Sequence, residues 1–345
     1  MSENKARELL WPTDTTILMR FVFLNVGQGS STVVLVRRGS TYKVILLDIN
    51  LDSENEGIDV PALIADLLDG DSLEVFVNTH PHSDHLRGIT ELADKVKINE
   101  VWHSGHVPGP KHNDAYRSLK EVIEKVVEDG GADKETVLTA SADEHTFEDG
   151  KYFVLSPKES LTDEVQDEEQ DERYARIHEQ CVVLKFGVEP TWVLLPGDAD
   201  REAFEKHVMK DHEERLASVV LAASHHGSRT FFKRDKDDDP YREGLDAIKP
   251  EYAVISAKNQ NADDSDPPHG DAIELYQEAC GEDSVVQTGE HGYSFISDIY
   301  DDGSYSGIRD DKGDIRDSYP LGTPKHAVVF PIIPRTRVDD RPMGE

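Results

Sequence analysis

The strongest constraint on the fold is one short segment in which three imidazoles and a carboxylate fall within six residues, His80-Pro81-His82-Ser83-Asp84-His85. It follows Leu73–Val77, an apolar run that predicts a buried strand, and loops after strands commonly carry chemistry. Residues two apart in an extended chain point the same way, so His80 and His82 can bind one ion together. Asp84 and His85 lie past the turn, at the start of the next predicted helix, and can reach a second ion. Imidazole and carboxylate ligands suit Zn²⁺ first, and also Mn²⁺ or Fe²⁺.

A site for two divalent ions needs further ligands, ideally with one carboxylate that bridges both ions. Asp198 follows the strongly apolar segment Thr191–Leu195, which is a predicted strand, and is the predicted bridge. His225 and His226 follow a predicted buried strand, and adjacent residues in an extended chain point in opposite directions, so only one of them is expected to bind metal. We take His226 as the ligand and His225 as the catalytic histidine, although the sequence alone allows the reverse. His269 precedes a predicted helix and is assigned to the shell of the second ion.

The order of the predicted elements indicates one mixed α/β domain. Extended segments at Leu18–Val26, Thr32–Val36 and Lys43–Asp48 are followed by strand–helix alternation, and the second half repeats this order. We expect an N-terminal extension over residues 1–15, the domain over 16–300 and a C-terminal extension over 301–345. Residues 157–176 are acidic and poor in apolar side chains, which predicts an exposed insertion, either a solvated loop or a mobile lid.

The composition limits the partners. The chain has 345 residues, of which 70 are acidic and 37 basic, and its formal net charge of -33 repels nucleic acid and anionic membranes. A small or single-stranded substrate is therefore favoured over a long duplex. Two cysteines without a spacing motif, no signal-like apolar run and no stretch near the ~18–20 apolar residues of a membrane span together predict a cytoplasmic protein that does not enter a membrane; the oligomeric state is left open.

The ordered motifs resemble a known family. The series consists of Phe23-Leu24-Asn25-Val26-Gly27-Gln28-Gly29, Leu46-Leu47-Asp48, the His80–His85 segment, Leu195-Pro196-Gly197-Asp198, Ser224-His225-His226-Gly227-Ser228 and Pro268-His269. It is similar to the metallo-β-lactamase-fold domain of the ComEC competence proteins and their soluble relatives. The resemblance implies a four-layer αββα sandwich with two metal ions at one edge between the sheets. It also implies hydrolysis of phosphodiesters in nucleic acid, and it maps the histidines and aspartates named above, His269 included, onto metal-site positions.

Several positions depart from that family pattern. Asn25 and Ser30 stand where the family usually has aspartate, but Asp48 is kept and is expected to brace the metal loop from behind. Many members supply a lone histidine between the first cluster and the bridging aspartate. The paired histidines are ranked first for that role, ahead of His103, His106 and His178, and His178 is expected behind the ligands. The remaining histidines are expected at the surface: His112, His145, His207, His212 and His326.

The predicted reaction follows from charge. Two cations would lower the pKa of a bound water toward neutrality and stabilise charge on the scissile group. Asp84 and Asp198 are expected to position that water, and His225 to assist the leaving group. Arg229 and Lys233, beside Phe231 and Phe232, are expected to bind substrate phosphate, unless the aromatic pair belongs to the core.

Three functions remain open at this stage. The first is a metal-dependent phosphodiesterase or nuclease, acting on nucleic acid or a small phosphodiester. The second is a hydrolase of a thioester, lactone or amide, because the same chemistry attacks carbonyls and a fold does not determine its substrate. The third is a binding module without catalysis, which the full set of predicted ligands argues against.

Overall fold

Two β-sheets form the centre of the computed structural model, which describes residues 4–109, 114–259 and 265–321. The strand order of the first sheet is β15-β14-β1-β2-β3-β4-β5-β6, and that of the second is β13-β12-β11-β10-β9-β8-β7. The first sheet contains β1 (Ile17–Phe23), β2 (Thr32–Arg38), β3 (Thr41–Leu47), β4 (Leu73–Asn78), β5 (Ile98–His103), β6 (Glu135–Val137), β14 (Phe295–Tyr300) and β15 (Arg309–Asp310). The second contains β7 (His145–Phe147), β8 (Gly150–Ser156), β9 (Val183–Val188), β10 (Thr191–Leu195), β11 (Val220–Ala222), β12 (Tyr252–Ile255) and β13 (Val285–Gln287).

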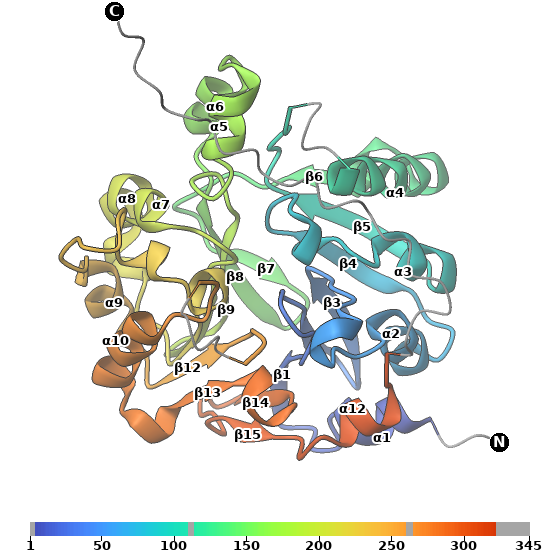
Figure 1. The fold of residues 1–345 in the computed structure, drawn as a ribbon. Helices are drawn as coiled ribbons and strands as arrows, with labels where there is room; N and C mark the ends of the chain where they lie inside the picture. Colours follow the sequence, from blue (N-terminus) through green and yellow to red (C-terminus); the bar gives the residue numbers. More distant parts are fainter. Residues whose placement is uncertain (1–3, 110–113, 260–264, 322–345) are drawn as a thin grey trace, which may run out of the picture.

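Helices cover the outer face of each sheet (Figure 1). Beside the first sheet lie α1 (Lys5–Leu10), α2 (Val60–Leu68), α3 (Ile89–Lys95), α4 (Asp114–Gly130) and α12 (Asp314–Ser318). Beside the second lie α7 (Arg201–Ala203), which continues through a π-helical turn (Phe204–Val208) into α8 (Met209–His212), and α9 (Glu243–Ile248) and α10 (Gly270–Cys280). The short α11 (Thr288–His291) precedes β14. The helices α5 (Glu159–Gln166) and α6 (Gln170–Ala175) stand apart at the top of Figure 1.

The helices on the outside and the two sheets between them form four layers, and three buried apolar clusters lie between successive layers. Strand β1 divides its side chains between two of them: Val22 packs toward the helices, whereas Phe21 and Phe23 pack between the sheets. All seven residues of β1 are buried, as expected for a strand covered on both faces. The predicted four-layer αββα sandwich is therefore confirmed.

The first turn after the histidine segment differs from the predicted helix over Leu86–Val96. A short 3₁₀ turn, Ser83–His85, is followed by α3, which begins only after Gly88. Gly88 has a φ of 109°, which residues with a Cβ rarely adopt and which is not helical. The helix therefore cannot extend back through Gly88. Asp84 and His85 consequently lie on a tight turn before the helix.

The segments outside residues 16–300 carry regular structure. Ala6 and Leu10 of α1 and Ile315 of α12 are fully buried in the same core layer as α2. The guanidinium of Arg20 donates to the backbone carbonyl of Leu10 and to both oxygens of Asp298, at 2.6 and 2.8 Å. His112, His326 and residues 322–345 of the predicted C-terminal extension lie outside the described residues.

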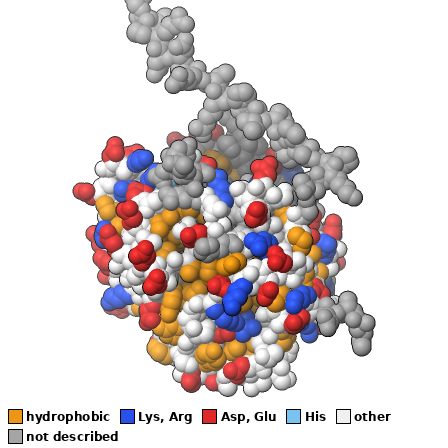
Figure 2. All heavy atoms as spheres, turned by 60° about the horizontal axis from the view of Figure 1, so that its bottom comes forward, with side chains coloured by type: hydrophobic (Ala, Val, Ile, Leu, Met, Phe, Trp, Pro, Cys, Tyr) orange, Lys and Arg blue, Asp and Glu red, His pale blue; other side chains and the backbone are white. Residues whose placement is uncertain are grey.

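Acidic and basic side chains are mixed on one face of the molecule. Figure 2 shows this face, where acidic side chains are scattered with lysine and arginine side chains between them. Among the described residues, no helix combines the length and the apolar character that crossing a membrane requires.

Candidate metal centre

The candidate ligands lie on loops that follow strands of both sheets. The His80–His85 segment follows β4, Asp198 follows β10, and His225 and His226 follow β11. Strand β4 runs parallel to β3 and β5, and β11 runs parallel to β10 and β12, so the carboxyl ends of these strands meet at one edge. That edge is where open α/β sheets commonly bind ligands.

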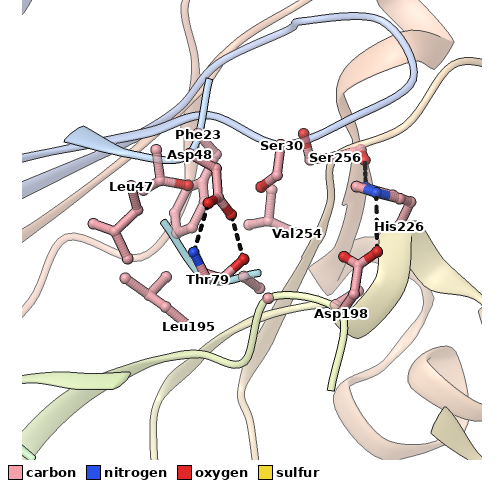
Figure 3. Close-up of a pocket in the computed structure, with 14 residues that line it drawn as sticks. Phe23, Ser30, Leu47, Asp48, Thr79, Leu195, Asp198, His226, Val254 and Ser256 are labelled. Carbon is pink, nitrogen blue, oxygen red and sulfur yellow. Dashed lines mark hydrogen bonds and ion pairs between the residues drawn. The ribbon is translucent and has the colours of Figure 1, made fainter. Parts of the chain in front are cut away.

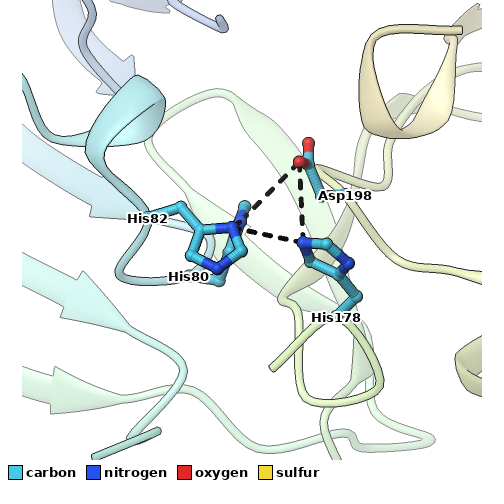
Figure 4. Close-up of side chains that lie close together, drawn as sticks. All are labelled: His80, His82, His178 and Asp198. Atoms are coloured by element: carbon cyan, nitrogen blue, oxygen red, sulfur yellow. Dashed lines mark hydrogen bonds and ion pairs between the residues drawn. The ribbon is translucent and has the colours of Figure 1, made fainter. Parts of the chain in front are cut away.

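One group of donor atoms consists of His80, His82, His178 and Asp198, and its atoms all lie within 4.8 Å of one another (Figure 4). Nδ1 of His82 lies 3.0 Å from Nε2 of His80 and 3.2 Å from Nε2 of His178. The Oδ2 atom of Asp198 lies 3.7 Å from the same nitrogen of His80 and 3.9 Å from that of His178. Three imidazoles and one carboxylate thus converge on one point, which is a ligand set that zinc favours.

The second group consists of Asp84, His85 and His226, within the same limit. Nε2 of His226 lies 3.2 Å from Nε2 of His85 and 3.3 Å from Oδ2 of Asp84. Asp198 also faces this group, with its Oδ1 atom 3.1 Å from His85 and its Oδ2 atom 3.5 Å from His226. Asp198 is 2% exposed and contacts both groups, so its carboxylate is placed to bridge two ions.

The chemistry of the second group fits a cation. Nδ1 of His226 contacts the backbone carbonyl of Ser256 at 2.9 Å, and a carbonyl only accepts hydrogen bonds, so the proton lies on Nδ1. Nδ1 of His85 donates to Oδ2 of Asp48 at 2.7 Å in the same way. Each ring thus has its Nδ1 atom hydrogen-bonded away from the site, and the two Nε2 atoms face each other at 3.2 Å. Partners on Nδ1 are typical of metal-binding histidines, whose Nε2 atoms face the ion.

The carboxylate of Asp48 holds the histidine segment from behind (Figure 3). Its Oδ1 atom accepts from the backbone N–H of Thr79 at 2.8 Å and from Asn78, and its Oδ2 atom accepts from the Thr79 hydroxyl at 2.6 Å and from His85. The Thr79 oxygen in turn lies 3.2 Å from Nδ1 of His80. Asp48 thus orients one ligand of each group, directly for His85 and through Thr79 for His80.

Replacing Asp48 with asparagine is expected to weaken metal binding by about 10–100-fold, the usual cost of losing a partner that orients a metal ligand. The amide NH₂ of asparagine only donates, so at the Oδ2 position it accepts from neither Thr79 nor His85. Competition with a chromophoric chelator measures this affinity. Asp52→Asn is the matched control, because Asp52 is also buried but accepts hydrogen bonds from Gln28 and Asn55, neither of which is a candidate ligand. Equal affinities for wild type and Asp48→Asn would contradict the assigned role.

Burial and charge act differently on the two groups. Burial lowers the pKa of His82 to about 4 and holds the pKa values of His80 and His178 well below their ordinary range, so these rings offer lone pairs at neutral pH. Burial also opposes the charge on His85, but the Asp198 and Asp48 carboxylates outweigh it and raise the pKa of that ring. Burial alone would raise the pKa of Asp198, but the surrounding imidazoles hold it well below its ordinary value. The site is therefore built to carry a carboxylate among imidazoles.

The histidine pair is not extended, unlike the expectation for two residues after a strand. His225 and His226 have φ values of 48° and 56°, in the left-handed region that is unusual for residues with a side chain. As a result both rings face Asp198, each with its Nε2 atom 3.5 Å from Oδ2. His226 belongs to a ligand group and His225 to neither, while Nδ1 of His225 contacts the hydroxyl of Thr230 at 2.9 Å.

Two other predicted site positions lie apart from the ligand groups. Among the described residues, neither group includes His269, whose Nδ1 accepts from the backbone N–H of Arg229 at 3.1 Å where α10 begins. Arg229 and Lys233 both contact the carboxylate of Asp271, at 3.1 and 3.0 Å. Phe231 and Phe232 are buried in the core of the second sheet, so they cannot stack on a base, and the reading of this pair as core packing is the one the structure supports.

The structure places His178, which we expected behind the ligands, within the first group of candidate donor atoms. The competing histidines have other partners: His103 contacts Glu135 at 3.1 Å, and His106 contacts Gln180. The only signal for His178 in the sequence was its position shortly before the strand β9 (Val183–Val188), within the interval that separates the first cluster from Asp198.

Part of the chain is similar to known proteins. Residues 26–173 match the family model of the metallo-beta-lactamase superfamily, and no curated protein matches the sequence. Solved structures with a similar fold include CmlA, a diiron beta-hydroxylase from Streptomyces venezuelae. The two sequences are 14% identical, the match covers 77% of this chain and 52% of CmlA, and the TM-score is 0.42. The chain thus spans about half the length of CmlA.

Two further structures are similar at the same low level of identity. YhfI from Bacillus subtilis, a metallo-beta-lactamase fold protein, has 11% identity, with 78% of this chain and 95% of YhfI covered and a TM-score of 0.41. ST1585 from Sulfolobus tokodaii, an archaeal metallo-beta-lactamase superfamily protein, has 14% identity and a TM-score of 0.27, and the match covers 51% of this chain and 62% of ST1585. The matched residues 26–173 include the His80–His85 segment and end five residues before His178. Residues 26–173 are thus similar to the metallo-beta-lactamase superfamily, the two sheets flanked by helices match the metallo-beta-lactamase fold, and the candidate metal site lies at the edge between the sheets.

Proposed function

We propose that the protein is a dinuclear-metal hydrolase that cleaves phosphodiester bonds in a small substrate or in short single-stranded nucleic acid. The observation that carries the proposal is that Asp198 joins two ligand groups while His225 stands beside them and belongs to neither. Such an arrangement provides sites for two ions and one additional group that can act on substrate. We take zinc as the metal, with manganese as the alternative.

The residues have separate tasks in this reaction. Two divalent ions, when bound, supply a water with a pKa near neutrality and offset the charge that develops on the scissile group. Asp198 and Asp84, as charged acceptors beside the ions, would position the attacking water. His225, fixed by Thr230, hydrogen-bonds the leaving oxygen and transfers a proton to it.

The surroundings of the site favour a small substrate. Arg229 and Lys233 both contact the carboxylate of Asp271, so these two cations are not arranged as a row for a long polyanion. The same observation favours a second candidate function, hydrolysis of a thioester, lactone or amide, whose carbonyl needs no cation beyond the metal pair.

The test is a substrate panel on the zinc-loaded protein, with bis-p-nitrophenyl phosphate, single-stranded DNA and RNA, and a set of thioesters and lactones. Phosphodiester turnover that disappears with chelator and returns with zinc supports the proposal. Turnover of acyl substrates alone overturns it in favour of the second candidate. Two bound ions without turnover of any member of the panel would leave a binding module as the remaining function.

Replacing His225 with alanine is expected to lower kcat on bis-p-nitrophenyl phosphate by about 10²-fold, because a general acid typically contributes at least that much. Metal content should stay at the wild-type value, since His225 is in neither ligand group. His145→Ala, on the edge strand β7, is the control and should leave both quantities unchanged. A His225→Ala variant that loses metal instead of rate would assign this histidine to the ligands.

A further inference from the structure

The acidic insertion carries the helices α5 and α6 and forms part of the site's wall. Leu161 and Val165 of α5 are 3% and 1% exposed. Arg176 pairs with Glu164 at 2.8 Å, with Glu168, and with Glu179 at 2.6 Å. These ion pairs connect the insertion to the segment that carries His178.

Within the insertion, Tyr174 on α6 lies against the metal centre. Its ring centroid is 5.5 Å from that of His82, with the two planes tilted by 53°. The side chain is partly buried. Its phenol O–H is a hydrogen-bond donor.

Tyr174 also closes one side of a cavity of about 330 Å³. The other lining residues come from the metal loop and from the first turn of α4: Pro81, His82, Ser83, Asp84, Asp114 and Ala115. This volume is at the lower end of the range of about 300–1,000 Å³ for small-molecule sites. No lysine or arginine is among these described lining residues, so a group that enters is small, polar and without a large negative charge.

We propose that Tyr174 is a catalytic residue that the acidic insertion supplies to the metal centre, and that the adjoining cavity receives a small uncharged portion of the substrate. The phenol donates its O–H to a non-bridging oxygen of the scissile phosphoryl group as negative charge grows there. A donor that is already in place gains strength as charge develops, because it needs no reorganisation during the reaction. The inference rests on the proposed phosphodiesterase function and adds a residue to it.

The experiment compares the zinc-loaded wild type with Tyr174→Phe, which keeps the ring against His82 and removes only the hydroxyl. Three quantities are measured: bound zinc per chain, kcat on bis-p-nitrophenyl phosphate, and the Kd of inorganic phosphate by calorimetry. The expected result is an unchanged zinc content, a loss of about 10²-fold in kcat and weaker phosphate binding. Tyr152→Phe is the matched control, since Tyr152 stacks on Phe186 between the sheets, and it should behave as wild type.

The outcomes separate this inference from the function on which it rests. If Tyr174→Phe keeps the wild-type kcat and Kd, the catalytic role of Tyr174 is wrong while the phosphodiesterase stands. If zinc content falls, the tyrosine is a structural support for the ligands and the proposal is equally overturned. If no phosphodiester is cleaved by wild type but Tyr174→Phe still weakens phosphate binding, the contact to the oxyanion stands and the phosphodiesterase function fails.

Discussion

Replacing Asp198 with asparagine is expected to reduce kcat/KM by more than about 10⁴-fold and to lower the zinc content from two ions per chain to at most one. The carboxylate faces both ligand groups, with its Oδ1 atom 3.1 Å from His85 and its Oδ2 atom 3.5 Å from His226. An amide has one oxygen and no charge, so it cannot bridge two cations. Without the ions, water at the site returns from a pKa of about 7 toward about 15.7, which is a far larger penalty than the expected loss. Steady-state kinetics and elemental analysis on the same sample measure both effects.

Asp200 provides the control for this substitution. It lies two residues further along the same loop, caps α7 by accepting from the backbone N–H of Ala203 at 3.0 Å, and is in neither ligand group. Asparagine caps helices about as well as aspartate, so Asp200→Asn should retain both ions and most of the activity. Two bound ions in Asp198→Asn would show that the carboxylate is not the bridge.

The second large effect is expected for His178→Ala, which should lose one of the two ions selectively. Structural zinc sites bind with about 10–16 kcal/mol, or roughly 3 kcal/mol per ligand, so the loss of one imidazole weakens that ion by about 10²-fold. The remaining ion lacks its partner across the scissile group, and the combined loss in kcat/KM is expected to be about 10³-fold. Metal titration followed by elemental analysis should then show one tight ion in place of two.

His207→Ala is the control for His178→Ala, because His207 contacts Glu179, the neighbour of His178 in the chain, and is in neither ligand group. It should keep two tight ions. A His178→Ala variant that also keeps two would return His178 to a place behind the ligands, as the sequence had suggested, and would leave the first group with two imidazoles.

Most of the fold was predictable because its elements follow strong local patterns. The strand expected over Leu73–Val77 is β4 and the strand expected over Thr32–Val36 is β2, and both begin at the predicted residue. The failures occurred where backbone conformation overrides side-chain pattern. The helix expected from Leu86 begins only after Gly88 because of that residue's positive φ.

The residues of the candidate site also differ in how far the sequence alone could predict them. Ligands clustered within one segment, such as His80 and His85, were visible from spacing alone. The placement of His178 depends on the path of the insertion and on Arg176, so the sequence could offer it only as one of several histidines. The opposed side chains expected for His225 and His226 required an extended chain, whereas both residues are left-handed.

Anomalous diffraction at the zinc edge from crystals of the zinc-loaded protein is the most direct test of the dinuclear centre. The account predicts two peaks, one among His80, His82 and His178 and one among Asp84, His85 and His226, with Asp198 between them. A single peak, peaks at other positions, or no peak from fully loaded protein would contradict a dinuclear centre bridged by Asp198.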